Sequence, residues 1–172
     1  GNMGGHAIGL SGMDGNMIKC KPLDDKHGFV GEIIKTNMDV IKEVLENNFI
    51  PVISTIGYDE QGNCYNINAD TVAAQIAGDL KAEALISMTD IVGLLRDIND
   101  ESTIIQKVFI SDIPALIADG IIKGGMIPKI DSMTQAIRNG CTKAFIIDGR
   151  VPHSILMELL TDEGMGTMFK GR

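Results

Sequence analysis

The chain contains no tryptophan, and only 4% of its 172 residues are aromatic. A core built on large rings is therefore excluded. The hydrophobic fraction is nevertheless 44%, which is close to that of an average globular chain and sufficient for a packed interior. We expect an aliphatic core of Ile, Val, Leu, Met and Ala, in which the scattered methionines fill space rather than form a site.

Basic residues are in the minority, with 15 Lys and Arg against 23 Asp and Glu, and the formal net charge is -8. A nucleic-acid-binding protein needs a basic stripe, so this balance argues against a nucleic-acid partner. A nucleotide is not excluded, because it requires only one or two local cations and some backbone N–H groups.

Closely spaced cysteine pairs are also lacking. Cys20, Cys64 and Cys141 lie far apart, and an odd number of cysteines without metal-ligand spacing is typical of reduced thiols in a cytosolic protein. No apolar run approaches the roughly 18 residues that a transmembrane helix needs. The first residues have neither the basic nor the apolar region of a signal peptide. We therefore expect a cytoplasmic protein without a membrane partner.

The common nucleotide fingerprints are absent as well. Neither GxxxxGK[ST] nor GxGxxG occurs, so neither the P-loop nor the dinucleotide-binding turn applies. The Gly-Leu-Ser-Gly segment at 9–12 is one residue too short for the GxSxG nucleophile elbow. The three histidines are isolated, and we expect no metal site built by the protein itself.

What the sequence does contain is an alternation of strand and helix patterns. Apolar periodicity predicts strands over 7–10, 16–19, 30–34, 50–55, 84–88 and 144–147, and helices over 37–47, 70–81, 113–119, 128–139 and 152–160. Close strand–helix–strand units favour parallel pairing with right-handed crossovers. The expected fold class is α/β, a three-layer αβα sandwich with a mainly parallel sheet.

Two details of this prediction concern particular strands. The first third should add antiparallel hairpins, because the turn-rich segment 11–15 separates strands 7–10 and 16–19. Strands 50–55 and 84–88 are rich in apolar residues, and we expect both to be buried.

One polar segment leads directly into a helix. It contains Asn66, Asn68 and Asp70, separated by small or apolar residues. Asn68 or Asp70 could cap the helix by accepting its first backbone N–H groups, which is the simpler interpretation of this segment alone. Alternatively, the helix N-terminus could hold an anion while Asp70 orients a cation nearby.

A Gly-Gly turn precedes the helix predicted over 128–139. Lys129 then lies at the positive end of that helix, where the dipole favours an acidic residue. Either Lys129 is simply solvated, or an anion such as phosphate lies between the lysine and the helix.

A third segment follows the predicted strand 84–88. Thr89 and Asp90 end the strand, and Gly93 would permit close approach of a ligand to the backbone. Ligands in open α/β sheets gather at the carboxyl ends of strands. A capped turn is the simpler interpretation when the segment is taken alone.

Taken in order, these segments resemble the amino acid kinase family, and within it the members that phosphorylate N-acetyl-L-glutamate. The most specific match is Asn-Ile-Asn-Ala-Asp at 66–70 followed by Gly-Gly-Met-Ile-Pro-Lys at 124–129. The resemblance continues through Thr-Asp-Glu-Gly-Met-Gly-Thr-Met at 161–168 and covers essentially the whole chain. It implies a phosphotransferase with a carboxyl group as acceptor, which uses ATP in arginine biosynthesis.

The resemblance also implies roles for individual residues. Asn66 would bind the acetylglutamate, Asp70 would hold two catalytic lysines in place, and Lys129 would be one of those lysines. Mg²⁺ would be held mainly by the ATP phosphates. The residues that would form the nucleotide pocket are Thr89, Asp90, Ile91, Val92, Gly93, Leu94, Leu95, Ile121, Ile122 and Lys123.

Regulation and assembly follow from the resemblance too. Arginine-sensitive members bind arginine near the C-terminal end, where the matching residues are His153, Glu163, Gly164 and Gly166. A homo-oligomer is expected. The division of roles would be acetylglutamate binding in residues 1–82 and nucleotide binding in residues 83–172.

Two alternatives remain open. One is a non-catalytic arginine-sensing or regulatory module of the same fold, although the presence of both Lys129 and Asp70 favours an enzyme. The other is a family member with a different acceptor.

The family also has an N-terminal strand with Lys-x-Gly-Gly, a Gly-rich loop and an arginine that grips the substrate. These features do not occur in the 172 residues. We therefore expect the chain to be the C-terminal portion of such an enzyme and to be inactive by itself.

Overall fold

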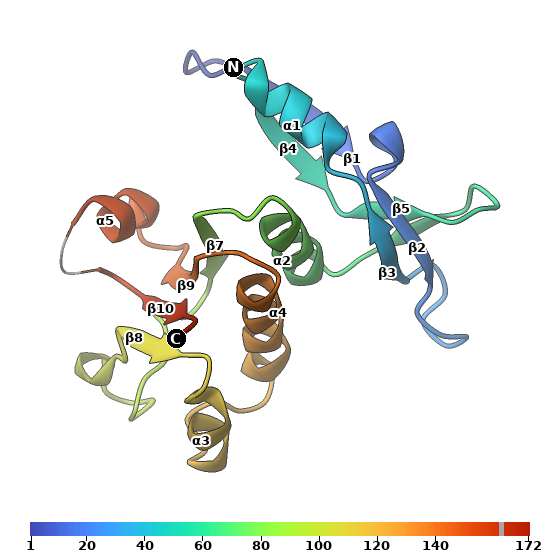
Figure 1. Ribbon diagram of the computed structural model, residues 1–172. Coiled ribbons are helices and arrows are strands. Elements are labelled where there is room, and N and C mark those ends of the chain that lie inside the picture. Colours follow the sequence, from blue (N-terminus) through green and yellow to red (C-terminus); the bar gives the residue numbers. More distant parts are fainter. Residues whose placement is uncertain (162–163) are drawn as a thin grey trace. The chain divides into compact units, whose positions relative to one another are not determined.

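The computed structural model describes residues 1–161 and 164–172, and it divides into two compact units (Figure 1). The N-terminal unit is Gly1–Val72 and the C-terminal unit is Ala73–Arg172. The structural boundary thus falls within helix α2 (Ala69–Asp79), whereas the division of binding roles at 82/83 stays a prediction.

The N-terminal unit contains two small sheets. Its elements before α2 are β1 (Ala7–Ser11), a 3-10 turn (Asp14–Asn16), β2 (Ile18–Pro22), β3 (Gly31–Thr36), α1 (Asp39–Glu46), β4 (Ile50–Ser54), β5 (Ile56–Tyr58) and β6 (Cys64–Asn66). Strands β1 and β4 pair in parallel, and the second sheet has the order β3-β2-β5-β6. Its β2–β3 and β5–β6 pairs are antiparallel, which confirms antiparallel hairpins in the first third.

The predicted hairpin between 7–10 and 16–19 is wrong. β1 pairs with β4, while β2 pairs with β3 and β5. The carboxylate of Asp14 accepts the Ser11 backbone N–H at 2.6 Å and the Ser11 hydroxyl at 3.1 Å, and this closes a tight turn. The 3-10 turn that follows redirects the chain, so that β2 enters the other sheet.

Strand β4 was predicted to be buried, and this is also wrong. Its side chains alternate between exposed and half-buried, and Val52 is 59% exposed. Although α1 contacts β4, the strand belongs to a sheet of only two strands, so part of its surface stays exposed. Strand β7 (Ala84–Thr89) is likewise mostly half-buried rather than buried, and Met88 near its end is exposed.

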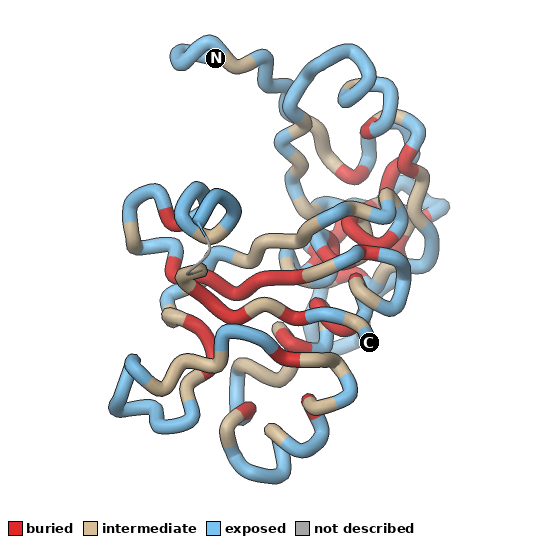
Figure 2. Tube along the Cα trace, turned by 60° about the vertical axis from the view of Figure 1, so that its left-hand side comes forward, coloured by how far each residue is buried: buried red, intermediate tan, exposed pale blue. Residues whose placement is uncertain are grey.

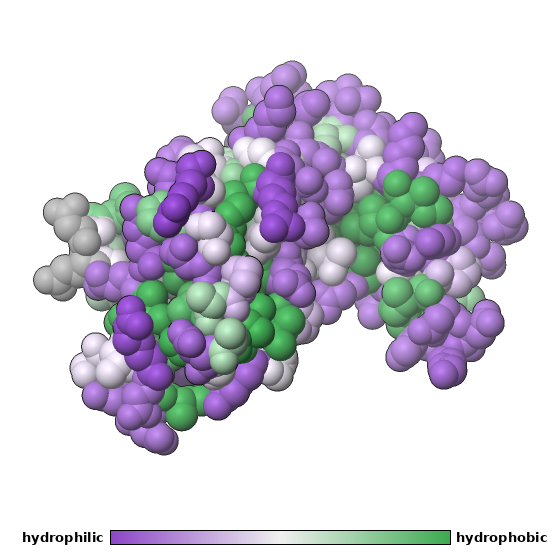
Figure 3. Space-filling view, turned by 60° about the horizontal axis from the view of Figure 1, so that its bottom comes forward, coloured by the Kyte–Doolittle hydropathy of each residue, from purple (hydrophilic) through white to green (hydrophobic). Residues whose placement is uncertain are grey.

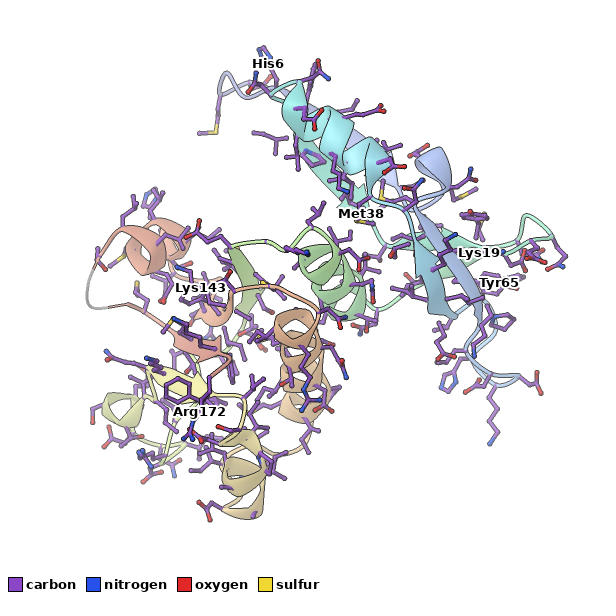
Figure 4. All side chains as sticks on the ribbon, viewed as in Figure 1. His6, Lys19, Met38, Tyr65, Lys143 and Arg172 are labelled. Carbon is purple, nitrogen blue, oxygen red and sulfur yellow. The ribbon has the colours of Figure 1, made fainter. Side chains whose placement is uncertain are left out.

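The polar turn between β5 and β6 is organised by one carboxylate. Asp59 accepts the backbone N–H groups of Gln61 and Asn63, and the Asn63 side-chain amide at 2.8 Å. It also accepts the hydroxyl of Tyr65, which is labelled in Figure 4. Hydrogen bonds from the Asn63 side chain and these other donors lower the pKa of Asp59.

The C-terminal unit is built around one four-stranded sheet of order β7-β9-β10-β8. β7 pairs in parallel with β9, β8 pairs in parallel with β10, and β9 and β10 are antiparallel. The α/β class with parallel strands is confirmed. The elements that follow β7 are a 3-10 turn (Glu101–Thr103), β8 (Lys107–Phe109), α3 (Ile113–Ala118), α4 (Met126–Arg138), β9 (Lys143–Asp148), α5 (Ser154–Leu160) and β10 (Thr167–Lys170).

The main core of this unit lies between α4 and the sheet. Figure 2 shows the longest buried stretches along the strands, and β9 is buried from Ala144 to Asp148. The core is aliphatic with one large ring, as the composition predicts. Its buried members are Leu94, Val108, Ile113, Ile122, Ile130, Met133, Ala144, Ile146 and Phe169.

Apolar side chains also reach the surface, where they form separate areas between polar ones (Figure 3). Helix α5 is notable, since Leu156 and Leu160 are both exposed. Among the described residues, no helix is long and apolar enough to cross a bilayer.

We predict that the core of the C-terminal unit depends on α4. Ile130→Ala should lower the free energy of unfolding by about 2 to 5 kcal/mol, because Ile130 is fully buried and the change leaves a cavity. Leu156→Ala on α5 is the matched control and should change it by no more than about 0.5 kcal/mol. Urea denaturation followed by circular dichroism measures both, and equal effects would contradict the assignment of the core.

Candidate functional site

The candidate site in the C-terminal unit lies where β7 and β9 end. These strands are parallel neighbours, and Thr89 at the end of β7 is in register with Asp148 at the end of β9. The Gly149 backbone N–H donates to the Thr89 carbonyl at 2.8 Å, so the pairing extends past the strands. The loops that follow both strands therefore begin at the same edge of the sheet.

The turn after β7 is closed by Thr89. Its hydroxyl accepts the backbone N–H of Ile91 and donates to the carbonyl of the same residue, both at 3.1 Å. The capped turn that the sequence suggested is therefore present. The turn leaves Asp90 exposed at its tip, so capping and a role at the site are compatible for this segment.

The loop then passes closely over β10. Gly93 has φ of 146°, and a Cβ there would lie 2.7 Å from the Thr167 hydroxyl oxygen. The buried Thr167 hydroxyl accepts the Leu94 backbone N–H at 2.8 Å. Glycine is required at position 93 because the backbone approaches Thr167 in a conformation that side chains rarely adopt.

This loop lines a hollow of about 540 Å³, which we call the first hollow. Six of the residues predicted for the nucleotide pocket line it: Ile91, Val92, Gly93, Leu95, Ile121 and Lys123. The structure thus brings together two segments, 91–95 and 121–123, that are separated in the sequence. Leu94 and Ile122 differ from the other six, because their side chains are buried in the core.

A smaller hollow of about 300 Å³, the second hollow, is lined by Thr89, Asp90, Gly125 and Lys129. Ile91 and Met126 line both hollows, so the two adjoin. The last two of the predicted pocket residues, Thr89 and Asp90, thus line the second hollow together with Lys129.

Lys129 comes from the first turn of α4. Gly124, with φ of 56°, turns the chain into the helix, which begins at Met126, two residues before the predicted start. No acidic residue lies in that first turn. The half-buried Lys129 therefore faces the second hollow near the positive end of the helix dipole.

Several residues of the first hollow were not predicted from the sequence. They include Arg96, Asp97, Glu101 and Arg150. Basic side chains outnumber acidic ones in its lining, three to two, although the chain as a whole is acidic. The first hollow therefore offers three cationic side chains to a ligand on an otherwise acidic protein.

Arg150 is held by an ion pair at the end of β9. Its Nε and Nη2 donate to the two carboxylate oxygens of Asp148 at 2.9 and 2.8 Å, and the Arg150 backbone N–H donates to the same carboxylate. These bonds lower the pKa of Asp148 to about 2. The Asp-Gly-Arg sequence directly after a strand was the signal that could have indicated this pair.

In the N-terminal unit, Asn68 and not Asp70 caps α2. The Asn68 side-chain oxygen accepts the Thr71 backbone N–H at 3.2 Å. Asp70 lies in the first turn of the helix and is half-buried. Asn66 ends β6 with an exposed side chain, and its backbone N–H donates to Phe29. The predicted roles of Asn66 and Asp70 stay predictions.

The residues predicted to bind arginine surround α5. His153 precedes the helix and is exposed, with φ of 63°. Glu163 lies outside the described residues. Gly166 is buried, and a Cβ there would collide with the Ile146 carbonyl, so packing of β10 against β9 already explains this glycine. Glu158 was not predicted from the sequence, and its carboxylate accepts the backbone N–H groups of Met165 and Gly166.

Within the part of the chain that the structure describes, no group of three or more His, Cys, Asp or Glu could hold a metal ion.

The hydroxyl of Thr167 should control the shape of the first hollow. Thr167→Val keeps the volume but leaves the buried Leu94 N–H without an acceptor, which should lower stability by about 1 to 3 kcal/mol. Thr167→Ser restores the acceptor and should recover most of that loss. Urea denaturation measures stability, and hydrogen exchange at Leu94 should accelerate only in the valine variant. An unchanged rate of hydrogen exchange at Leu94 in the valine variant would contradict this role of the Thr167 hydroxyl.

Known proteins are similar to this chain in sequence and in fold. The model of the amino acid kinase family matches residues 2–148. The acetylglutamate kinase of Brachyspira hyodysenteriae is 52% identical over 170 residues, covering 98% of this chain and 59% of that protein. The acetylglutamate kinase of Clostridium beijerinckii is 53% identical over 168 residues, covering 96% of this chain and 59% of that protein.

A solved structure is similar to this chain in fold over nearly its whole length. The crystal structure of smu.665 from Streptococcus mutans UA159 superposes with a TM-score of 0.79 at 31% identity, covering 99% of this chain and 63% of that chain. The chain thus spans about 59% of the length of the curated relatives named above. Because the family model covers most of its length, this chain belongs to the amino acid kinase family.

Proposed function

We propose that this chain is the nucleotide-binding and phosphoryl-transferring part of an enzyme that phosphorylates the side-chain carboxylate of N-acetyl-L-glutamate with ATP. The observation that supports the proposal most is the pair of adjoining hollows, one of which contains Lys129 at a helix N-terminus. The acceptor is taken from relatives about half identical to this chain, which are acetylglutamate kinases. Such an enzyme would act in arginine biosynthesis.

The first hollow suits a nucleoside. Its volume of about 540 Å³ lies within the usual range for small-molecule pockets. Ile91, Val92, Ile121 and Met126 offer apolar surface that could flank a purine ring, and charged groups at the margin could orient ribose and phosphates. Leu94 and Ile122 would act indirectly, because their buried side chains anchor the two segments that form the hollow.

The second hollow suits the transferring phosphoryl group. Lys129 and the first N–H groups of α4 both favour negative charge there. Phosphoryl transfer gains most from positioning and charge neutralisation, so a lysine that meets the charge developing in the transition state is the expected catalytic device. Mg²⁺, when bound with ATP, would neutralise further phosphate charge. The ATP phosphates would be its main ligands.

The acceptor would be bound by the N-terminal unit. Asn66 is exposed at the end of β6 and has an amide suited to a carboxylate or acetyl group. Asp70 would orient the catalytic lysines, one of which lies outside this chain. We propose that the 172 residues alone do not turn over substrate, because the family's Lys-x-Gly-Gly strand is not among them.

Feedback inhibition by arginine, assembly into a homo-oligomer and a cytoplasmic location belong to the same proposal. His153, Gly164 and Gly166 would contribute to the arginine site. The Glu158 carboxylate would hold the 165–166 backbone in place beside it.

The test of the phosphoryl-transfer role is Lys129→Ala in a protein that joins this chain to the N-terminal part found in its relatives. Turnover of N-acetyl-L-glutamate and ATP should fall by about a hundredfold or more, with little change in stability. Lys129→Arg should restore little, because a guanidinium is planar and not a compact charge. Lys123 lines the first hollow, so Lys123→Ala should mainly raise the KM for ATP. Near-normal turnover of the Lys129→Ala variant would refute the assignment.

Asp70→Asn in the same protein separates orientation of the lysines from helix stabilisation. Asn68 already caps α2, so removing the charge at position 70 should move the unfolding free energy by no more than about 1 kcal/mol. Turnover should nevertheless fall strongly.

Asn68→Ala is the matched control for this prediction. It removes the cap, should cost about 1 kcal/mol of stability and should leave turnover of the folded enzyme close to normal. Normal turnover of Asp70→Asn would mean that Asp70 only stabilises the helix.

A further inference from the structure

Arg150 occupies an unusual position at the first hollow. Two of the five N–H donors of its guanidinium, on Nε and Nη2, are directed at Asp148. Asp148 is buried at the end of β9 and does not line the hollow, whereas Arg150 lines it and its side chain is 65% exposed. The guanidinium is therefore held along one edge, and the donors of its other edge, which have no partner among the described residues, remain for a ligand in the hollow.

The arrangement is built to fix the direction of the guanidinium. The Arg150 backbone N–H donates to the same Asp148 oxygen as Nε does, both at 2.9 Å, so that main chain and side chain are tied to one carboxylate. The Gly149 N–H in turn donates to Thr89, which closes the neighbouring turn. An arginine pre-oriented in this way loses little conformational entropy when it binds an anion.

The charges around Arg150 indicate the kind of ligand. Arg96 and Lys123 line the same hollow, and Asp97 and Glu101 are its acidic members. Glu101 and Asp90 also favour the charged form of Arg150. The hollow thus presents three cationic side chains that could contact an anion, although the chain has a net charge of -8.

We propose that Arg150, oriented by Asp148, binds a phosphate group of the nucleotide in the first hollow through the free edge of its guanidinium. The proposal deepens the proposed function and rests on it. A planar guanidinium matches two oxygens of one phosphate with parallel hydrogen bonds. A nucleotide that extends from the first hollow into the second would then meet Arg150 before Lys129.

The competing interpretation is that the pair only fastens the loop after β9. The two interpretations differ in their consequences. If the pair only holds the loop in place, its loss should change the affinity for every ligand of the hollow equally, including a ligand without phosphate. If Arg150 binds a phosphate group, its loss should weaken the binding of ATP and ADP and hardly change the binding of adenosine.

The experiment is calorimetric titration of the 172-residue chain with ATP, ADP and adenosine, comparing the unmodified protein with Arg150→Gln, Arg150→Lys and Asp148→Asn. Arg138→Gln, an identical change in the last turn of α4 and outside both hollows, is the matched control. Thermal unfolding of each variant establishes that it is folded.

Arg150→Gln should weaken ADP and ATP binding by about tenfold or more, the loss expected for one charge-assisted contact, and leave adenosine binding unchanged. Arg150→Lys should retain part of the affinity. Asp148→Asn should fall between the unmodified chain and Arg150→Gln, because the guanidinium is present but less well oriented. The Arg138→Gln control should bind like the unmodified chain.

Three outcomes would overturn the inference, and they can be told apart. Unchanged ADP affinity in Arg150→Gln would show that Arg150 is only a fastener. Equal losses for ADP and adenosine would show that the hollow itself had changed. An unmodified chain that binds none of the three ligands would refute the nucleotide site, and with it both this inference and the proposed function.

Discussion

The parallel pairing of β7 with β9 is the constraint on which the candidate site depends. It sets Thr89 opposite Asp148, so that both strands deliver their following loops to one edge of the sheet. The bond from Gly149 to Thr89 carries the register beyond the strands. A one-residue slip would move every side chain of β9 to the other face of the sheet, including that of Asp148, which orients Arg150. Both hollows are consequences of this register, because residues after β7 line each of them.

The electrostatics of the site run against those of the whole chain. An acidic protein repels phosphate at long range, and salt screens that repulsion beyond about 10 Å. What remains at contact distance is the local set of Arg150, Lys123 and Lys129 with the N-terminus of α4. Asp148 offsets part of the charge of Arg150, but it also fixes the direction of the guanidinium. Local geometry, and not net charge, decides what kind of ligand the hollows favour.

A segment whose side chains cap a turn or a helix can also contribute residues to the candidate site. Thr89 closes a turn and also lines the second hollow. In segment 66–70 the cap is Asn68, so Asp70 at the second position of α2 needs no capping role. Gly166 shows the opposite case, since the close approach of β10 to β9 explains it without any ligand. Capping and close packing therefore account for some of the polar and glycine residues of the motifs, and leave others for chemistry.

The sequence by itself determined the α/β class and the five helices of the described residues to within a few positions, because apolar periodicity and turn residues are local properties. It also indicated several of the segments that line the two hollows. The sequence also indicated the family through motifs at 66–70 and 124–129. Tertiary structure alone decided that β1 pairs with β4 and not with β2, since strand pairing depends on long-range contacts that no local pattern encodes. It likewise buried Leu94 while exposing Val52, because burial is set by which elements cover a face. Arg150 joined the site for the same reason: its neighbours in the first hollow lie far away in the sequence.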